Sequence, residues 1–364
     1  MEIGVQLIFQ SYGYPKDFPD QQVIDEEVRL SVLADELGFD ALWPVEHHFE
    51  DYSFCPDNTQ YLAYIGARTQ RIRLATGAVI LPWHPPLRVA ERIALLDALT
   101  GGRVIFGMGR GLSRKEYEPM GVPMDESRER FDEAAPMILQ ALETGFIEGH
   151  GRFYPQARAA IRPKPSRSFK GRASSVAMSP DSAVQAGKLG VRMVLFSEKP
   201  YDQQYQSIDL YRQTWRDTHG SEPPAPMVCD FAYCDKDASK AEAMAREHIG
   251  GYLASVLHHY EIASDHYKNT KGYEHYGRQV DTIKKLGFEG MFERYLKVQC
   301  WGTPAQILEK YAARRKALGD FNITGCFRYA GMPEAAAAAS MRLYAAEVMP
   351  ELRRWAKQDK KAVA

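Results

Sequence analysis

The stretch LLDALTGGRVIFGMGRGL, residues 95–112, contains the unit that decides the fold. Its first residues complete an apolar helical pattern over 88–99, and Gly101 and Gly102 follow the end of that helix. The run Val104–Met108 then predicts a buried strand, and a glycine-rich loop follows it. A helix, a strand and a loop in this order are typical of α/β proteins.

The same alternation continues along most of the chain. Eight strand-like runs separated by helical stretches predict a closed (β/α)8 TIM barrel. An open, doubly wound parallel sheet has the same period and remains an alternative at this point. The predicted strands cover residues 3–9, 41–45, 72–81, 104–108, a stretch ending at 176–178, 191–196, 228–233 and 323–329. The predicted helices cover 23–38, 88–99, 128–142, a helix opening at Ser179-Pro180, 205–219, a long helix from about 238, and 334–355.

Two stretches interrupt this alternation. Residues 145–165, after helix four, contain several glycines and prolines and predict a small insertion. Residues 260–296, after strand seven, include many polar and aromatic side chains and several glycines. We expect this segment to form a mobile lid. We expect a single domain over residues 1–364.

The composition excludes several classes of protein. The 46 Lys and Arg and 47 Asp and Glu residues give a formal net charge of -1, without the basic surplus of a nucleic-acid or anionic-membrane binder. No run of eighteen apolar residues predicts a membrane span, and the first ten residues lack the basic start of a signal peptide. The five cysteines are scattered and form no CxxC pair, which argues against a disulfide framework and structural zinc. We therefore expect a reduced, cytoplasmic protein.

Two neighbouring strand ends carry residues suited to a phosphate group. Arg110 lies between Gly109 and Gly111, where the backbone can approach a ligand and the guanidinium can bind phosphate with two hydrogen bonds. Ser179 and Ser182 fall on one side of the first turn of a helix, where free N–H groups and hydroxyls can hold an anion. Taken singly, each pattern also fits an ordinary turn or a capped helix. In a barrel the two strand ends are adjacent, and together they predict a phosphate site.

The second strand ends in Glu46-His47-His48-Phe49. Adjacent residues of an extended segment face opposite sides, so only one of the two histidines can point into the barrel mouth. A neutral imidazole there could act as a base, although a structural histidine is an equal alternative. No HExxH or comparable ligand set is present, and we expect no metal site.

Six segments in this order resemble the bacterial luciferase-like flavin monooxygenases, and within that family particularly the luciferase alpha subunits. They are GFDALWPVEHHF (38–49), TGAVILPWHPP (76–86), LLDALTGGRVIFGMGRGL (95–112), SPDSAVQAGKLGVRMVL (179–195), WGTPAQILEKY (301–311) and SMRLYAAEVMPEL (340–352).

The resemblance implies a TIM barrel that binds reduced FMN delivered by a separate flavin reductase. It also implies a reaction with O2 through a C4a-peroxyflavin that oxidises a small apolar substrate such as an aldehyde or a ketone. Family members commonly form dimers, so we expect a homodimer. Two alternatives stay open: an F420-dependent hydride-transfer oxidoreductase on the same barrel, and a non-catalytic flavin-binding subunit. A sugar-phosphate barrel enzyme is a third reading, disfavoured by the lack of an evident lysine or carboxylate pair.

The same resemblance implies roles for single residues. His47 matches the catalytic base, and Arg110 matches a phosphate ligand. Ser179 and Ser182 match the phosphate-binding hydroxyls. The backbone of Met178 is expected to lie against the flavin, and Gly77-Ala78 falls where the family has a non-proline cis peptide beneath the flavin ring.

Three positions depart from the luciferase pattern. Gly109 stands where luciferases carry a reactive cysteine, Ser197 where they carry a tryptophan, and Glu116 where they carry an aspartate. The expected lid retains Lys271-Gly272-Tyr273 but is otherwise different. These changes surround the expected substrate position, so the resemblance predicts the cofactor and leaves the substrate open.

Overall fold

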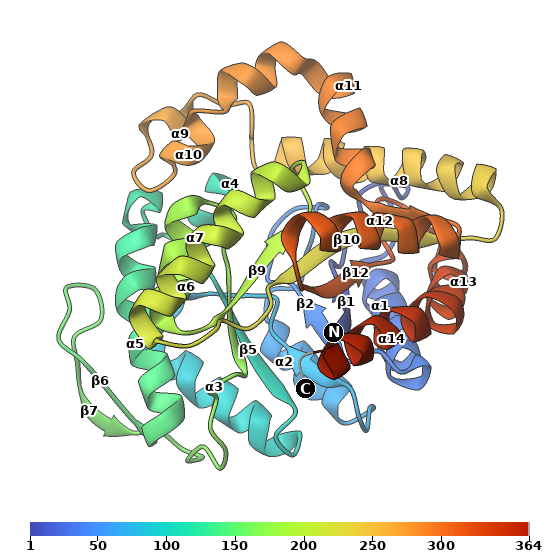
Figure 1. Ribbon diagram of the computed structural model, residues 1–364. Helices are drawn as coiled ribbons and strands as arrows, with labels where there is room; N and C mark the ends of the chain where they lie inside the picture. The colour runs from blue at the N-terminus through green and yellow to red at the C-terminus, as the bar shows by residue number, and fades with distance from the viewer. Residues whose placement is uncertain (363–364) are drawn as a thin grey trace.

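Eight parallel strands close into a barrel in the computed structural model, which describes residues 1–362 (Figure 1). The ring runs β12-β1-β2-β3-β5-β8-β9-β10, and parallel pairs β9–β10 and β10–β12 complete it. This closure confirms the predicted TIM barrel and excludes the open sheet. The strands are β1 (Ile3–Leu7), β2 (Ala41–Pro44), β3 (Arg73–Ala75), β5 (Val104–Gly109), β8 (Ala173–Val176), β9 (Arg192–Phe196), β10 (Met227–Cys234) and β12 (Asn322–Cys326).

Helices surround the barrel. The expected ones are present with bounds shifted by a few residues, except that the last one is divided by a π-helical turn at Tyr344–Val348. Two further helices, α2 and α12, occupy stretches for which the sequence pattern predicted no element. The helices of the ring are α1 (Asp20–Leu37), α2 (Asn58–Gly66), α3 (Pro86–Leu99), α5 (Ser127–Thr144), α6 (Pro180–Leu189), α7 (Tyr201–His219), α8 (Ala238–His259), α12 (Pro304–Leu318), α13 (Glu334–Leu343) and α14 (Met349–Ala362).

The third predicted strand, residues 72–81, is not continuous. It is divided into β3 and the short β4 (Val79–Ile80), and residues 81–83 form a 3-10 turn. Between them the Gly77 N–H donates to the Pro44 carbonyl, and the Thr76 hydroxyl donates to the Gly107 carbonyl at 2.8 Å. These bonds draw the segment out of the regular ladder, so a run of strand-forming residues is not one strand. The Gly77–Ala78 peptide bond is cis, at the position that the resemblance indicates.

The barrel interior holds a small apolar cluster separate from the core beneath the helices. Its members come from strands around the whole ring, so they can meet only inside it. The cluster consists of Ala41, Trp43, Ala75, Ile105, Val194 and Met227, with Val176 packed against it. Neighbouring strand residues of opposite orientation, such as Leu42, Leu74 and Phe106, belong to the large core that the helices cover.

Two additions to the barrel lie in the predicted insertion and lid stretches. β6 (Phe146–Gly149) and β7 (Gln156–Ala160) pair as an antiparallel hairpin, which projects at the lower left of Figure 1. The lid stretch contains α9 (His266–Asn269), α10 (Glu274–Gly277) and α11 (Val280–Val298), which form the top of the molecule in that view. The mobility of this segment stays a prediction.

Two further predictions concern the cysteines and the membrane. All five cysteines are buried and free. Across residues 1–362, none of the helices has the length and apolar character needed to cross a bilayer.

Candidate active site

One cavity of about 1170 Å³ opens at the carboxyl ends of the barrel strands. Loops after β2, β3, β5, β8 and β9 contribute to its wall, and α7, α8 and the α9–α11 segment complete it. This is the face on which barrel enzymes place their chemistry. Of the residues predicted to form the site, His47, Gly77, Ala78, Arg110, Met178 and Ser182 line this cavity.

A positively charged corner lies where β5 meets the start of α6. Arg110 follows β5, and Nη2 of Arg128, from the first turn of α5, lies 3.5 Å from the Ser182 hydroxyl. Burial, and then the neighbouring charge of Arg110, lower the pKa of Arg128. Neither guanidinium forms an ion pair within the described part of the chain. An anion placed between them would relieve their repulsion, so this corner fits a phosphate group.

Ser179 and Ser182 have different structural roles at the start of α6. Ser179 is the N-cap of α6: its hydroxyl accepts the Ser182 N–H at 3.3 Å, and Pro180 follows at the first helical position, as predicted. The two hydroxyls lie 3.0 Å apart, but Ser179 is buried and Ser182 lines the cavity. Ser179 therefore shapes the helix start, and Ser182 presents the accessible hydroxyl.

The middle of the cavity is bounded by backbone with small side chains. Gly77 and Ala78 contribute to one wall, and the side-chain amide of Asn58 donates to the Ala78 carbonyl at 3.0 Å. Met178 lies in the loop beyond β8, which ends at Val176, two residues before the end predicted. At Gly109, a Cβ atom would lie 2.9 Å from Cδ1 of Ile80, so an isoleucine fills the space beside the position of the luciferase cysteine.

His47 and His48 point to opposite sides, as their alternation predicts. His47 lines the cavity, whereas His48 is buried with Nε2 3.5 Å from the Glu46 carboxylate. The same carboxylate lies 2.6 Å from Nε2 of His84. Of these two histidines, His47 is thus the one that a bound molecule can reach.

Glu116 orients His47. Its Oε1 atom lies 2.9 Å from Nδ1 of His47 and accepts the backbone N–H of His48 at 2.9 Å. Burial by itself raises the pKa of the Glu116 carboxyl, but the charges and hydrogen bonds of His47 and His259 outweigh it and hold the pKa at about 2. With the carboxylate at Nδ1, Nε2 of His47 is the nitrogen on the cavity side, and the Tyr260 hydroxyl lies 3.3 Å from it.

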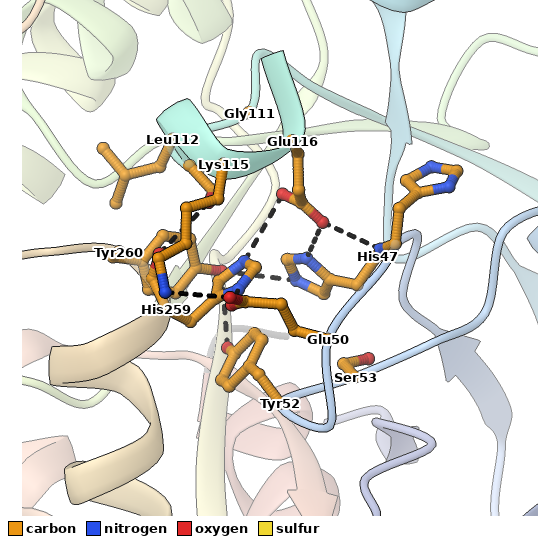
Figure 2. A network of polar contacts seen from close by, with 12 residues as sticks. His47, Glu50, Tyr52, Ser53, Gly111, Leu112, Lys115, Glu116, His259 and Tyr260 are labelled. Carbon is orange, nitrogen blue, oxygen red and sulfur yellow. Dashed lines mark hydrogen bonds and ion pairs between the residues drawn. The ribbon is translucent and has the colours of Figure 1, made fainter. Parts of the chain in front are cut away.

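Polar contacts continue from Glu116 to the protein surface (Figure 2). Nε2 of His259 lies 3.5 Å from Oε2 of Glu116, and its Nδ1 lies 2.6 Å from the Glu50 carboxylate. Lys115 donates to the other Glu50 oxygen at 2.8 Å. His47, Glu116 and His259 place ligand-type atoms within 4.8 Å of one another. The expectation of no metal stays a prediction.

Several of these residues were not singled out from the sequence. Arg128 and Glu50 lie in an ordinary helix and an ordinary polar loop, and no local pattern distinguishes them. His259 falls inside the long helix that the sequence predicts from about residue 238, a position that favours a structural or lid-related role. Glu198 lines the cavity, and burial raises the pKa of its carboxyl, yet its side chain has no hydrogen-bond partner among residues 1–362.

Comparison with known proteins identifies relatives over nearly the whole length. A family model described as luciferase-like monooxygenase matches residues 1–320. The alkanal monooxygenase alpha chain of Photobacterium leiognathi is 26% identical over 346 residues, covering 92% of this chain and 94% of the relative. The monooxygenase RslO1 from Streptomyces bottropensis has a TM-score of 0.78 and 25% identity, covering 97% of this chain and 100% of that structure.

More distant solved structures share the fold. The oxygenating constituent of 3,6-diketocamphane monooxygenase from Pseudomonas putida, solved in complex with FMN, has a TM-score of 0.73 at 18% identity and covers 96% of this chain and 98% of that one. A coenzyme F420-dependent tetrahydromethanopterin reductase from Methanopyrus kandleri has a TM-score of 0.65 at 21% identity and covers 96% and 99%. The fold alone therefore does not choose between these cofactors.

Proposed function

The chain belongs to the luciferase-like monooxygenase family, and from this membership we propose that it is the oxygenating component of a two-component FMN-dependent monooxygenase. In this proposal a separate flavin reductase supplies reduced FMN, and O2 is the co-substrate. The organic substrate is a small apolar molecule such as an aldehyde or a ketone. A cytoplasmic location, where reduced flavin is available, is part of the same proposal.

The observation that carries the proposal is that one cavity joins a phosphate-binding corner to an oriented imidazole. Arg110 and Ser182 line one side, with Nη2 of Arg128 3.5 Å from the Ser182 hydroxyl, and His47, with Glu116 at its Nδ1, lines another. Gly77 and Ala78, which carry small side chains, also line this cavity. A sugar-phosphate enzyme needs a phosphate-binding corner but no room for a large flat ring. A phosphate-binding corner and an oriented imidazole in one large cavity therefore favour a flavin mononucleotide.

Each part of the cavity has a separate task in this proposal. Arg110 and Arg128 bind the phosphate and set the position of the ring. His47 removes or returns a proton at Nε2, and the segment containing α9–α11 excludes water from the reaction. Bound reduced FMN supplies the chemistry that activates O2. The protein orients the flavin, excludes water from the cavity and transfers protons.

The substrate side of the cavity is mostly apolar. α8 contributes Leu253, Val256 and Leu257, and α11 contributes Ile283 and Leu286. This lining suits an apolar substrate.

The decisive experiment is anaerobic titration of the protein with reduced FMN, followed by mixing with air-saturated buffer in a stopped-flow spectrometer. We expect tight binding and a delayed return of the oxidised flavin spectrum compared with free reduced FMN. Reduced F420 in the same titration tests the alternative cofactor. Binding of reduced F420 but not of reduced FMN would overturn the proposal. Binding of reduced FMN without product from a panel of aldehydes and ketones would favour a non-catalytic flavin-binding subunit.

We also propose that the chain forms a homodimer through its first helices. Leu95 and Leu99, one turn apart on α3, are 49% and 66% exposed, and Tyr64 on the adjacent α2 is 48% exposed. Such neighbouring apolar side chains on a barrel exterior fit an interface between copies of the chain.

A further inference from the structure

We propose that Glu116, His259 and Glu50 form a buried proton relay that connects His47 with solvent. The use of this relay in turnover rests on the proposed function, whereas its existence is a property of the protein without flavin. His47 faces the cavity, and Glu50, with 24% of its side chain accessible, faces solvent. Figure 2 shows the two imidazoles and the two carboxylates in alternation between these ends.

The inner half of the relay is the pair of imidazoles that share Glu116. Oε1 of this carboxylate contacts Nδ1 of His47 at 2.9 Å, and Oε2 lies 3.5 Å from Nε2 of His259. Glu116 and His259 are almost wholly inaccessible to solvent, with 1% and 0% of their side chains exposed. Glu116 and His259 themselves therefore exchange protons with bulk water only through their neighbours in the network, His47 on the cavity side and Glu50 on the surface side.

The outer half leads from His259 to the surface. Nδ1 of His259 and Oε2 of Glu50 are 2.6 Å apart, which is a short, charge-assisted hydrogen bond. Lys115 holds the other Glu50 oxygen at 2.8 Å, and Nε2 of His258 lies 3.1 Å from the same ammonium. Burial raises the pKa of Glu50, but Lys115 and His259 outweigh it and lower the pKa, so Glu50 stays ionised, accepts the hydrogen bond from His259 and releases to water any proton that it receives.

A structural role alone does not account for His259. Its Nε2 atom is buried and makes no hydrogen bond, yet it is directed at the Glu116 carboxylate. A buried histidine with a purely structural role normally has partners for both nitrogens. Movement of a few tenths of an ångström by Glu116 would close this gap and complete the chain.

The proton transfers balance without any other reagent. When His47 takes a proton at Nε2, it passes its Nδ1 proton to Glu116, and Glu116 passes a proton to Nε2 of His259. His259 then passes its Nδ1 proton to Glu50, which releases it to water. Only N–H and O–H bonds form and break, and no electrons are transferred. Running the steps backward returns a proton to His47 for the donation step of the reaction.

The net charge of the relay favours the binding of one additional proton by its imidazoles and carboxylates. Two carboxylates and the Lys115 ammonium give a net charge of about −1 when both imidazoles are neutral, so one added proton makes the network neutral. The other polar groups that face His259 are the phenols of Tyr52 and Tyr260, with ring centroids 4.3 and 4.7 Å away. Tyr260 also lies 3.3 Å from Nε2 of His47, and burial raises the pKa of both phenols, so they remain neutral.

The test is a pH titration of the flavin-free protein with isotope-labelled histidine, followed by NMR of the ring signals. The His47 and His259 signals are identified by comparison with His47→Gln and His259→Gln. In the wild type we expect both sets of signals to move over the same pH range, with curves broader than those of a single site. In His259→Gln we expect His47 to follow a single-site curve with its midpoint at a higher pH than in the wild type, because His259 no longer competes for the shared proton.

Two further variants separate proton coupling from a general structural effect. His248→Gln removes a buried histidine of the same helix α8 that bonds the Ala330 carbonyl and lies outside the network, and we expect it to leave the His47 curve unchanged. Glu50→Gln changes a partly accessible side chain, and we expect the His259 signals to move to lower pH. This second variant keeps the test decisive if His259→Gln does not fold.

Independent single-site curves for His47 and His259 in the wild type, together with an unchanged His47 curve in His259→Gln, would overturn the relay. Ring signals that begin to titrate only after treatment with EDTA would also overturn it, because they would indicate a metal ion between the imidazoles. Failure of the protein to bind reduced FMN would remove the proposed function but would leave these curves unaffected. The two proposals can therefore fail separately.

Discussion

The guanidinium of Arg110 lies over the ring of Tyr273, with 4.1 Å between Cζ and the ring centroid. Nη1 of Arg110 also donates to the Gly272 carbonyl at 2.7 Å, and the Tyr273 hydroxyl donates to the Gly111 carbonyl at 2.8 Å. The side chain predicted to bind phosphate is therefore one of those that hold the α9–α11 segment against the barrel. In the proposed function, phosphate binding and closure of the cavity would therefore depend on the same arginine.

Arg110→Ala is expected to weaken FMN binding at least about tenfold, because a charge-assisted hydrogen bond to phosphate is lost. Riboflavin, which lacks the phosphate, should be affected much less. Fluorescence titration with both flavins measures the difference. Tyr273→Phe is the matched control, since it retains the ring beneath Arg110 and removes only the hydroxyl. Equal weakening of both flavins in Arg110→Ala would argue against a phosphate role.

His47→Ala is expected to fold and to bind FMN but to lose oxygenation by a factor of about 10² to 10⁴, the usual size of a general acid–base contribution. Product formation in single-turnover reactions with reduced FMN measures this loss. His150→Ala, which changes an exposed histidine on the β6–β7 hairpin, serves as the control. Unchanged product formation in His47→Ala would remove this residue from the mechanism.

Glu116→Gln is expected to lower the free energy of unfolding at pH 7 by about 1–3 kcal/mol. The pKa of Glu116 is about 2 in the folded protein against an ordinary value of 4.5, so the folded state favours the ionised carboxylate. This stabilisation is complete above about pH 4.5 and is lost as the pH falls through 2. Urea unfolding at pH 7 and pH 3 should therefore show a smaller difference between wild type and variant at the lower pH. Glu118→Gln, on the exposed side of the same loop, should show no such convergence.

Gly107→Ala is expected to abolish stable folding or to lower the melting temperature sharply. A Cβ atom at this position in β5 would lie 1.9 Å from the Thr76 carbonyl oxygen, which belongs to the backbone and cannot move away cheaply. Gly290→Ala on α11 is the control, because its Cβ would meet only Leu286 at 3.5 Å. Alanine is favoured over glycine in a helix by about 1 kcal/mol, so this variant should be slightly more stable. Thermal unfolding of the two variants tests the contrast.

Replacing both Leu95 and Leu99 with glutamate is expected to yield a monomer, because charges would be placed on the apolar face of α3. Sedimentation velocity measures the mass before and after the change. Tyr205→Glu, at a similarly exposed residue of α7, should leave the assembly unchanged. A wild-type protein that sediments as a monomer would contradict the proposed homodimer.

Much of the barrel was predictable from local patterns. Runs such as 104–108 and 191–196 became strands because burial on both faces selects continuous apolar residues. The N-cap at Ser179 was predictable because serine followed by proline satisfies the first turn of a helix. Residues 72–81 do not form a single strand. Hydrogen bonds from this segment to Gly107 and Pro44, which are distant in sequence, interrupt it.

The candidate site was predictable only in part. Strand-end positions identified His47 and Arg110, since parallel strands bring their carboxyl ends to one face. Arg128 could not be found in this way, because its importance comes from the approach of α5 to the start of α6 rather than from neighbouring residues in sequence.

The amino-acid sequence by itself determined the alternation of strands and helices, and with it the set of side chains that stand at the barrel mouth. Only the tertiary structure decided which of these side chains become partners. Glu50 and His259 are 209 positions apart, and Glu116 and His47 are 69 apart. Periodicity and capping are properties of short segments, whereas such contacts depend on the closure and register of the whole barrel, which no short segment specifies.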